Sequence, residues 1–201
     1  HRQSGPTEYM RQAMVAPIEV VIEEGPGGKV TISEAEYTSE GFETDGLDLY
    51  KRYPAGIACY YTGPTPIHQE YPNYYHSGSY MQPFYLSDET YEDPYQLDVN
   101  CNVVVNNTDG SVVGYKYFNF DGLKKGKTSL DISMKPLGVE GRIDVMIDSP
   151  WESKGGKKVG SLTLTKDMPQ EVQDIQIALD DLTQLKGKHA IYLLFSAEEP
   201  N

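Results

Sequence analysis

Short stretches in which apolar and polar residues alternate recur along most of this chain. The clearest are residues 112–120, where Phe118 and Phe120 continue the alternation, and residues 128–135, which read TSLDISMK. Alternation with a period of two is typical of a β-strand that buries one face. The same pattern, or a short apolar run, predicts further strands at residues 13–22, 29–37, 57–61, 103–105, 141–147, 159–165, 172–179 and 190–195.

Turn signals rich in glycine and proline separate these predicted strands. The strongest is residues 23–28, which read EEGPGG, and others are Asp121-Gly122 and Gly155-Gly156. Many short strands at such spacing indicate an all-β sandwich or barrel rather than βαβ units. Only residues 178–185 are predicted to make a helical turn.

Residues 60–95 break this rhythm. They hold nine of the 16 tyrosines and five prolines, with almost no aliphatic periodicity. This composition suits neither a helix nor a packed core. It predicts a surface insertion whose flat rings, each with a polar hydroxyl, face a polyhydroxylated or protein partner.

Charge and cysteine content narrow the classes of function. With 17 Lys+Arg against 30 Asp+Glu the net charge is −13, which argues against nucleic acid and anionic membranes as partners. The basic cluster Lys154, Lys157 and Lys158 is interpreted as a solvated hairpin tip. No apolar run approaches the ~20 residues of a membrane span.

Cys59 and Cys101 lack metal-ligand spacing, which leaves two interpretations: small half-buried side chains, or a disulfide that closes the tyrosine-rich loop.

Three segments together resemble family 6 carbohydrate-binding modules. Residues 32–37 (ISEAEY) resemble the opening strand of that family, and residues 110–120 (GSVVGYKYFNF) resemble a central strand. Residues 141–148, 160–162 and 187–195 resemble its closing half. The resemblance covers residues 29–201 and implies a β-sandwich of the jelly-roll type, with a tyrosine-rich insertion at about 60–98 and the final strand missing.

The beginning of the chain resembles a different family. Residues 1–4, 8–12 and 16–19 look like the last strands of the five-bladed propeller of glycoside hydrolase family 43, and residues 53–59 resemble sequence that follows it in some members. We therefore expect residues 1–28 to be terminal propeller strands plus a linker, in a longer protein, since His1 is no natural start. The family's catalytic carboxylates belong to earlier blades, so the resemblance implies no catalytic residue in this fragment.

The resemblance also implies a structural Ca²⁺ beside the first strand. Glu34 and Glu36, two positions apart, would point the same way from a strand and offer two hard oxygen ligands. The alternative is an ordinary solvated face of an edge strand.

In the family, two aromatic rings commonly sandwich the sugar. Here those places fall near Ser111 and at Met168-Pro169-Gln170, so both rings are absent. Replacement candidates for carbohydrate binding are the single tryptophan and the tyrosines of the insertion: Trp151, Tyr71, Tyr74, Tyr75 and Tyr80. The alternatives are that Trp151 is a hydrophobic lid, and that the tyrosines pack on the sandwich or against the propeller.

These expectations combine into one functional hypothesis. The fragment is a non-catalytic carbohydrate-binding module of a glycosidase of arabinofuranosidase or xylosidase type that acts on arabinoxylan or xylan. Its partners would be a polysaccharide or oligosaccharide and the catalytic propeller of the parent enzyme. The alternative is a structural accessory domain that buttresses the propeller or extends its active-site rim without binding sugar. An extracellular or periplasmic location is inferred only from the supposed substrate.

Overall fold

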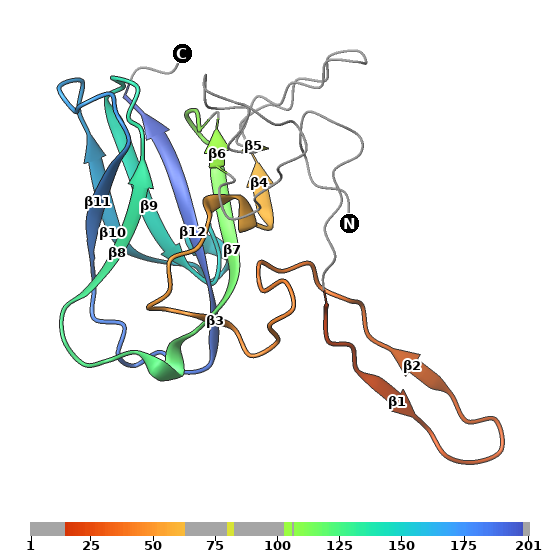
Figure 1. The fold of residues 1–201 in the computed structure, drawn as a ribbon. Coiled ribbons are helices and arrows are strands. Elements are labelled where there is room, and N and C mark those ends of the chain that lie inside the picture. The colour runs from red at the N-terminus through yellow and green to blue at the C-terminus, as the bar shows by residue number, and fades with distance from the viewer. Residues whose placement is uncertain (1–14, 63–79, 83–102, 106, 199–201) are drawn as a thin grey trace, which may run out of the picture.

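The computed structural model describes residues 15–62, 80–82, 103–105 and 107–198 (Figure 1). Within these ranges the chain consists of β-strands joined by turns and by short 3₁₀ segments, and it contains no helix long and apolar enough to cross a membrane. The expectation of an all-β fold is confirmed.

One eight-stranded sheet forms the body of the molecule. Its strand order is β3-β7-β12-β9-β10-β11-β8, and β4 pairs with β7 next to β3. All of its pairs are antiparallel except the parallel pair β3–β7. The strands are β3 (Leu47–Asp48), β4 (Tyr60–Thr62), β7 (Val112–Asn119), β8 (Thr128–Met134), β9 (Gly141–Ile147), β10 (Lys157–Leu164), β11 (Gln173–Leu179) and β12 (Lys188–Ala197).

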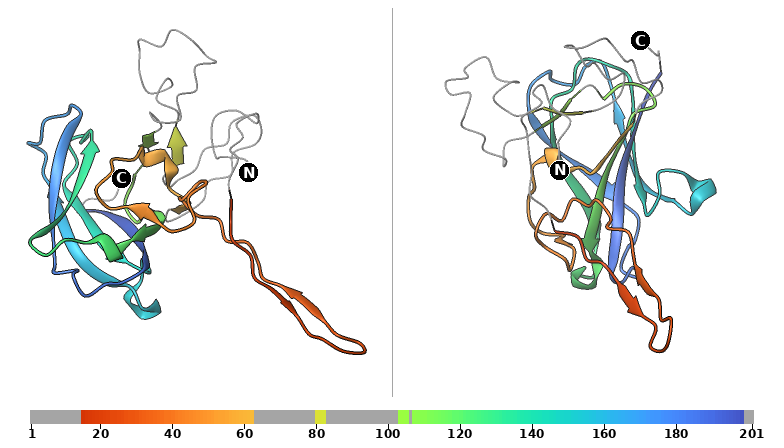
Figure 2. Two further views of the ribbon diagram at one scale, coloured as in Figure 1. Left: turned by 60° about the horizontal axis from the view of Figure 1, so that its bottom comes forward. Right: turned by 90° about the vertical axis from the view of Figure 1, so that its right-hand side faces the viewer.

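The sheet is strongly curled (Figure 2). Strand β10 pairs with β9 at seven positions but with β11 only at Gly160 and Leu179. A register shift between Lys158 and Gly160 marks the bend. Gly160 is required there because a Cβ would lie 2.5 Å from the Leu179 side chain and 2.8 Å from the Ala178 carbonyl oxygen. The bend lets one sheet enclose a core in the manner of a sandwich.

The main core lies inside the curl and is built by alternation. In β9, Ile143, Val145 and Ile147 are all buried in it, as the predicted strand at residues 141–147 requires. The other buried members come from neighbouring strands and turns: Phe120, Val159, Ile177, Leu182, Ile191 and Leu193.

A second apolar cluster covers the opposite face of the central strands. Met146, Ala190 and Tyr192 are buried there together with Val112. Strand β12 therefore contributes to both clusters, because Ile191 and Leu193 face the main core. This double burial explains why residues 190–195 read as a continuous apolar run.

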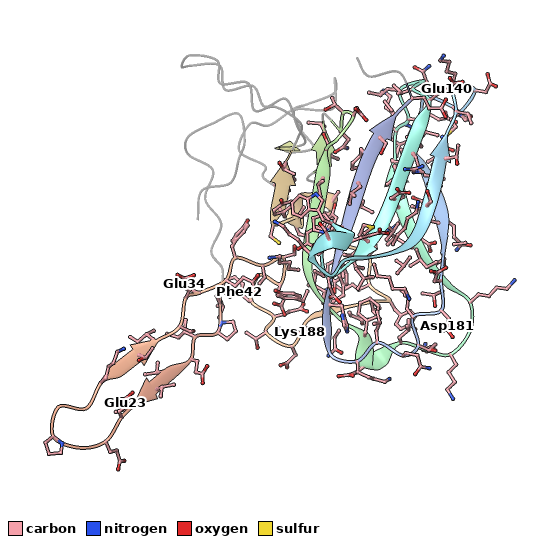
Figure 3. All side chains as sticks on the ribbon, turned by 180° about the vertical axis from the view of Figure 1, so that it is seen from behind. Glu23, Glu34, Phe42, Glu140, Asp181 and Lys188 are labelled. Carbon is pink, nitrogen blue, oxygen red and sulfur yellow. The ribbon has the colours of Figure 1, made fainter. Side chains whose placement is uncertain are left out.

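Two further pairs of short strands lie outside the main sheet. Strand β1 (Val20–Ile22) pairs with β2 (Val30–Ile32) in a hairpin that projects from the body, and β5 (Tyr80–Gln82) pairs with β6 (Val103–Val105) (Figures 1 and 3). The 3₁₀ segments are η1 (Ala55–Ile57), η3 (Phe120–Gly122) and η4 (Glu152–Lys154). The turn predicted at residues 23–28 is confirmed, since the Glu23 N–H donates to the Lys29 carbonyl at 2.9 Å.

The prediction of a half-buried strand at residues 29–37 is wrong. Only Val30–Ile32 is a strand, and all three of its residues are exposed. The reason is that β2 pairs with β1 alone, and no layer within the described residues covers the hairpin. The hairpin also joins residues from both sides of the domain boundary expected after residue 28. Residues 178–185 form no helix either: they end β11 and make a turn in which the Leu185 N–H donates to the Leu182 carbonyl at 2.9 Å.

Candidate functional site

Trp151 lies in a tightly bonded turn between β9 and β10. The backbone N–H of Trp151 donates to the Ser149 hydroxyl at 3.2 Å. The backbone carbonyl of Trp151 accepts the N–H groups of Lys154 and Gly156, both at 3.0 Å. Gly156 is needed because a Cβ would lie 2.1 Å from the Ser149 carbonyl oxygen. These bonds fix the backbone of the turn, and 42% of Trp151 remains exposed.

Two tyrosines support the tryptophan from other parts of the chain. The Tyr60 ring lies 6.5 Å from the Trp151 ring at 83° and 5.8 Å from the Tyr192 ring at 85°, both edge-to-face contacts. Such pairs contribute about 0.5–1.5 kcal/mol each beyond the burial of area. We call Trp151, Tyr60 and Tyr192 the aromatic cluster.

Tyr60 and Tyr192 of the aromatic cluster belong to a row of paired residues that runs across five strands. Lys158 pairs with Met146, Met146 with Tyr192, and Tyr192 with Gly114, which also pairs with Tyr60. A Cβ at Gly114 would lie 2.5 Å from Tyr192 Cε1 and 3.0 Å from Tyr60 Cβ. Because Gly114 has no Cβ, the Tyr192 ring can pack directly against its backbone. Sequence reasoning missed Tyr60 and Tyr192 as site residues, and the glycine inside the strand run VVGYKYFNF was the signal available.

A charged network lies beside this row. One Asp144 oxygen accepts from the Ser161 hydroxyl at 2.7 Å and pairs with Lys158 at 2.7 Å, and Arg142 Nε contacts both carboxylate oxygens at 2.9 and 3.0 Å. Burial by itself raises the pKa of Asp144. The hydrogen bonds and positive charges outweigh burial and hold that pKa below its ordinary value.

Replacing Asp144 by asparagine is expected to flatten the loss of stability in acid. Because the folded-state pKa is depressed, this carboxylate stabilises the fold above its unfolded-state pKa of about 3.9, and the contribution is lost as the pH falls through the folded-state value. At pH 7 the variant should be about 2 kcal/mol less stable, with a smaller difference below pH 3. Urea unfolding at both pH values measures this, with Asp167→Asn, an exposed carboxylate, as control. Equal losses at both pH values would contradict it.

The proposed calcium ligands are not arranged as expected. Residues 33–36 follow the end of β2 and are not in a strand, so Glu34 and Glu36 do not share a strand face; Figure 3 shows Glu34 at the base of the hairpin. Glu36 accepts from Lys116 Nζ at 2.7 Å and from the Tyr117 hydroxyl at 2.8 Å, one on each oxygen. No group of three or more His, Cys, Asp or Glu side chains suited to a metal occurs in the described ranges. These residues do not fit a calcium site as they stand, and bound calcium stays a prediction.

The positions that would hold the family's two platform rings have other roles here. Ser111 is fully buried, and its hydroxyl accepts the Thr108 N–H at 3.1 Å. Pro169 accepts a hydrogen bond from the Gln173 amide at 2.9 Å, and the Gln170 side chain lies against Gly138. Neither place presents an aromatic ring.

Several expected site residues lie outside what the structure describes. Tyr71, Tyr74 and Tyr75 fall there, and for Tyr80 only the backbone of β5 is described. Cys101 also lies outside, so the disulfide question stays open. The Cys59 thiol lies 3.7 Å from the Gly114 carbonyl oxygen, and burial raises its pKa.

His189 and Asp148 are the residue types of a catalytic dyad, but their contacts leave no ring nitrogen for a substrate. His189 Nδ1 lies 2.9 and 3.0 Å from the two Asp148 carboxylate oxygens, and its Nε2 lies 3.1 Å from the Lys186 carbonyl oxygen. Both ring nitrogens are thus engaged within the protein. The pair ties the end of β9 to the start of β12 and offers no nitrogen to a substrate.

The fold is that of an all-β, sandwich-like domain, and comparisons with known proteins agree. No protein-family model and no curated protein matches the chain. Among solved structures it is similar to a glycoside hydrolase family 43 arabinoxylan arabinofuranohydrolase from Bacillus subtilis, determined in complex with cellotetraose. The TM-score is 0.51 and the identity 18%, over 90% of this chain and 30% of that one. The chain thus spans less than a third of that hydrolase.

A family 6 carbohydrate-binding module from Clostridium cellulolyticum, determined in complex with xylose, is also similar. The TM-score is 0.39 and the identity 17%, over 52% of this chain and 73% of that one. The hydrolase comes from one of the two families that the sequence resembles. At such identities the likeness to the hydrolase shows a shared fold.

Proposed function

We propose that this chain is a non-catalytic carbohydrate-binding domain of a glycosidase that acts on arabinoxylan- or xylan-type polysaccharide. The observation that carries the proposal is the exposed indole of Trp151, fixed in its turn and backed by Tyr60 and Tyr192. The C–H faces of a pyranose stack on such a ring, while its hydroxyl groups remain free for hydrogen bonds.

Two lysines near the aromatic cluster could bond to sugar hydroxyls. Lys154 Nζ lies 4.9 Å from the centre of the Trp151 ring, and Lys158 lies in the same cross-strand row as Tyr192. Because Lys154 is exposed, a sugar can displace it from the ring at little cost. The tyrosines Tyr71, Tyr74, Tyr75 and Tyr80 are kept in the proposal as a second aromatic surface.

In the parent enzyme this domain would act through proximity. Binding the polymer raises the concentration of substrate near a linked catalytic domain without any chemistry in the binding domain. The resemblance to glycoside hydrolase family 43 supports a propeller of arabinofuranosidase or xylosidase type as that catalytic domain. An extracellular or periplasmic location follows from a polymeric substrate.

A second candidate function, a structural accessory domain, is favoured by the β1–β2 hairpin. The register places Val20, Ile22, Val30 and Ile32 on one face, each between 51% and 67% exposed. An isolated two-stranded hairpin is marginally stable in water, so an apolar surface is expected to cover this face. The propeller is the proposed occupant, and the domain boundary would then follow Ile32 instead of residue 28.

Affinity electrophoresis of the whole chain through gels with arabinoxylan, xylan or β-glucan tests the proposal. We expect retardation by arabinoxylan or xylan, and at least tenfold weaker binding for Trp151→Ala, a loss of about 1.4 kcal/mol. Phe42→Ala, which removes a ring that is 70% exposed on another loop, is the matched control. Runs with calcium and with EDTA check the calcium prediction.

The possible outcomes separate the two candidate functions. Passage through every gel without retardation would remove the binding function and favour the structural one. Retardation that survives Trp151→Ala would keep the function but move the site away from the aromatic cluster, toward the tyrosine-rich insertion.

A further inference from the structure

A run of lysines lies in the turn between η3 and β8. Lys124, Lys125 and Lys127 are all exposed, and none forms a salt bridge within the described residues. The chain as a whole carries a net charge of −13, so three unpaired lysines within four positions oppose its average charge. These lysines are distinct from the basic cluster Lys154, Lys157 and Lys158 predicted from the sequence.

A tyrosine from a distant segment lies against this run. The Lys124 N–H donates to the Tyr50 hydroxyl at 2.8 Å, and Lys124 Nζ lies 4.7 Å from the centre of the Tyr50 ring. Tyr50 is 56% exposed, and its own N–H donates to the Asp48 carboxylate at 2.9 Å. Two segments 74 residues apart thus form one surface.

The base of the lysine turn is fixed to the core. Phe120 is buried, Leu123 packs against the main core, and the Asn119 side chain accepts the Asp121 N–H at 2.9 Å. The lysines therefore project from an anchored element. We call Tyr50, Lys124, Lys125 and Lys127 the lysine–tyrosine surface. None of its residues belongs to the aromatic cluster.

The chemistry of this surface fits a carboxylated sugar polymer. Ammonium groups pair with carboxylates, while an exposed phenol ring stacks on a pyranose face. A nucleic acid fits poorly, because it carries a phosphate at every nucleotide, and strong phosphate binding takes a larger cluster of cations than three lysines. A sugar chain that carries few carboxylates needs only a few lysines beside one ring.

We propose that the lysine–tyrosine surface binds polysaccharides that carry uronic acid groups. Lys124, Lys125 and Lys127 pair with the carboxylates, and Tyr50 receives a sugar ring. This site goes beyond the proposed function, because it is separate from Trp151 and recognises a different feature of the polymer.

The test compares glucuronoxylan with the same polymer after its carboxyl groups are reduced, by affinity electrophoresis at low and high salt. The variant is Lys124→Gln/Lys125→Gln/Lys127→Gln. The control is Lys29→Gln/Lys135→Gln/Lys166→Gln, which makes the same change in charge at exposed lysines elsewhere. We expect at least tenfold weaker binding of glucuronoxylan by the variant alone at low salt, and little difference between proteins at high salt.

Each other result overturns the inference. Equal affinity for native and carboxyl-reduced polymer would show that the protein does not recognise the carboxylate. Equal binding by variant and control would show that Lys124, Lys125 and Lys127 do not contribute to binding. Tighter binding to polyphosphate than to polygalacturonate would change the ligand class. Trp151→Ala separates this site from the first, because it should weaken binding of neutral arabinoxylan while the lysine variant should not.

Discussion

Replacing Lys188 by methionine is expected to lower the melting temperature by roughly 10 °C, through a loss of about 3 kcal/mol of unfolding free energy. Glu40 is only 5% exposed, and its carboxylate accepts from Lys188 Nζ at 3.0 and 3.3 Å and from the Gly46 N–H at 2.8 Å. Lys188 also donates to the Thr44 carbonyl at 3.0 Å. Without the lysine, the buried Glu40 carboxylate would keep only the Gly46 N–H as a donor.

The double variant Glu40→Gln/Lys188→Met separates the cost of losing the ion pair from the cost of leaving the Glu40 carboxylate buried without its partner. Removing both charges should recover part of the stability, since the larger cost comes from the unpaired carboxylate. Lys186→Met, two positions earlier and exposed, is the control for loss of a lysine. Thermal unfolding of the four proteins gives the comparison. A melting temperature of Lys188→Met equal to that of the control would show that the pair contributes no stability.

Gly114→Ala is expected to destabilise the protein by about 2–3 kcal/mol and to disturb the aromatic cluster. The added Cβ would lie 2.5 Å from the Tyr192 ring, which is buried and cannot move outward freely. Displacing Tyr192 shifts Tyr60 and then Trp151, since the Tyr60 ring contacts both other rings. Sugar binding should weaken as well.

The single tryptophan makes this prediction measurable by spectroscopy. Fluorescence of Trp151 should shift to longer wavelength if its packing on Tyr60 loosens, and urea unfolding gives the loss of stability. Gly122→Ala is the matched control because a Cβ there meets nothing within 4 Å. Unchanged fluorescence and stability in Gly114→Ala would mean that the Tyr192 ring has room to relax.

Alternation predicted the strands that bury one face against the main core. Residues 141–147 and 172–179 correspond closely to β9 and β11, because every second residue, among them Ile143, Val145 and Ile177, points into that core. Residues 29–37 carried a similar pattern, yet their strand is short and exposed. Alternation shows that a strand has an apolar face, but it does not show what covers that face.

The candidate sites depended on contacts that sequence spacing does not reveal. Tyr60, Gly114 and Tyr192 meet only because β4 and β12 flank β7. Glu36 is predicted as a metal ligand from its spacing with Glu34, but its contact with Lys116, 80 residues away, could not be predicted from the sequence. Trp151 could be chosen as a candidate because it is the single tryptophan of the chain. Tyr50 and Lys124 could not be paired from sequence, since their contact joins two turns.

The position of β12 in the sheet has a consequence for how the polypeptide acquires its fold during synthesis. It is the last strand in the described part of the chain, yet it lies between β7 and β9 and contributes to both apolar clusters. During synthesis, β7 and β9 therefore emerge before β12, the strand that pairs with both. Until β12 is made, the strand edges that it pairs with stay open and both apolar clusters are incomplete. Long-range pairing of this kind folds slowly and leaves edges open to other chains. Conditions that slow translation near residues 188–197 should lengthen the time spent in that aggregation-prone state.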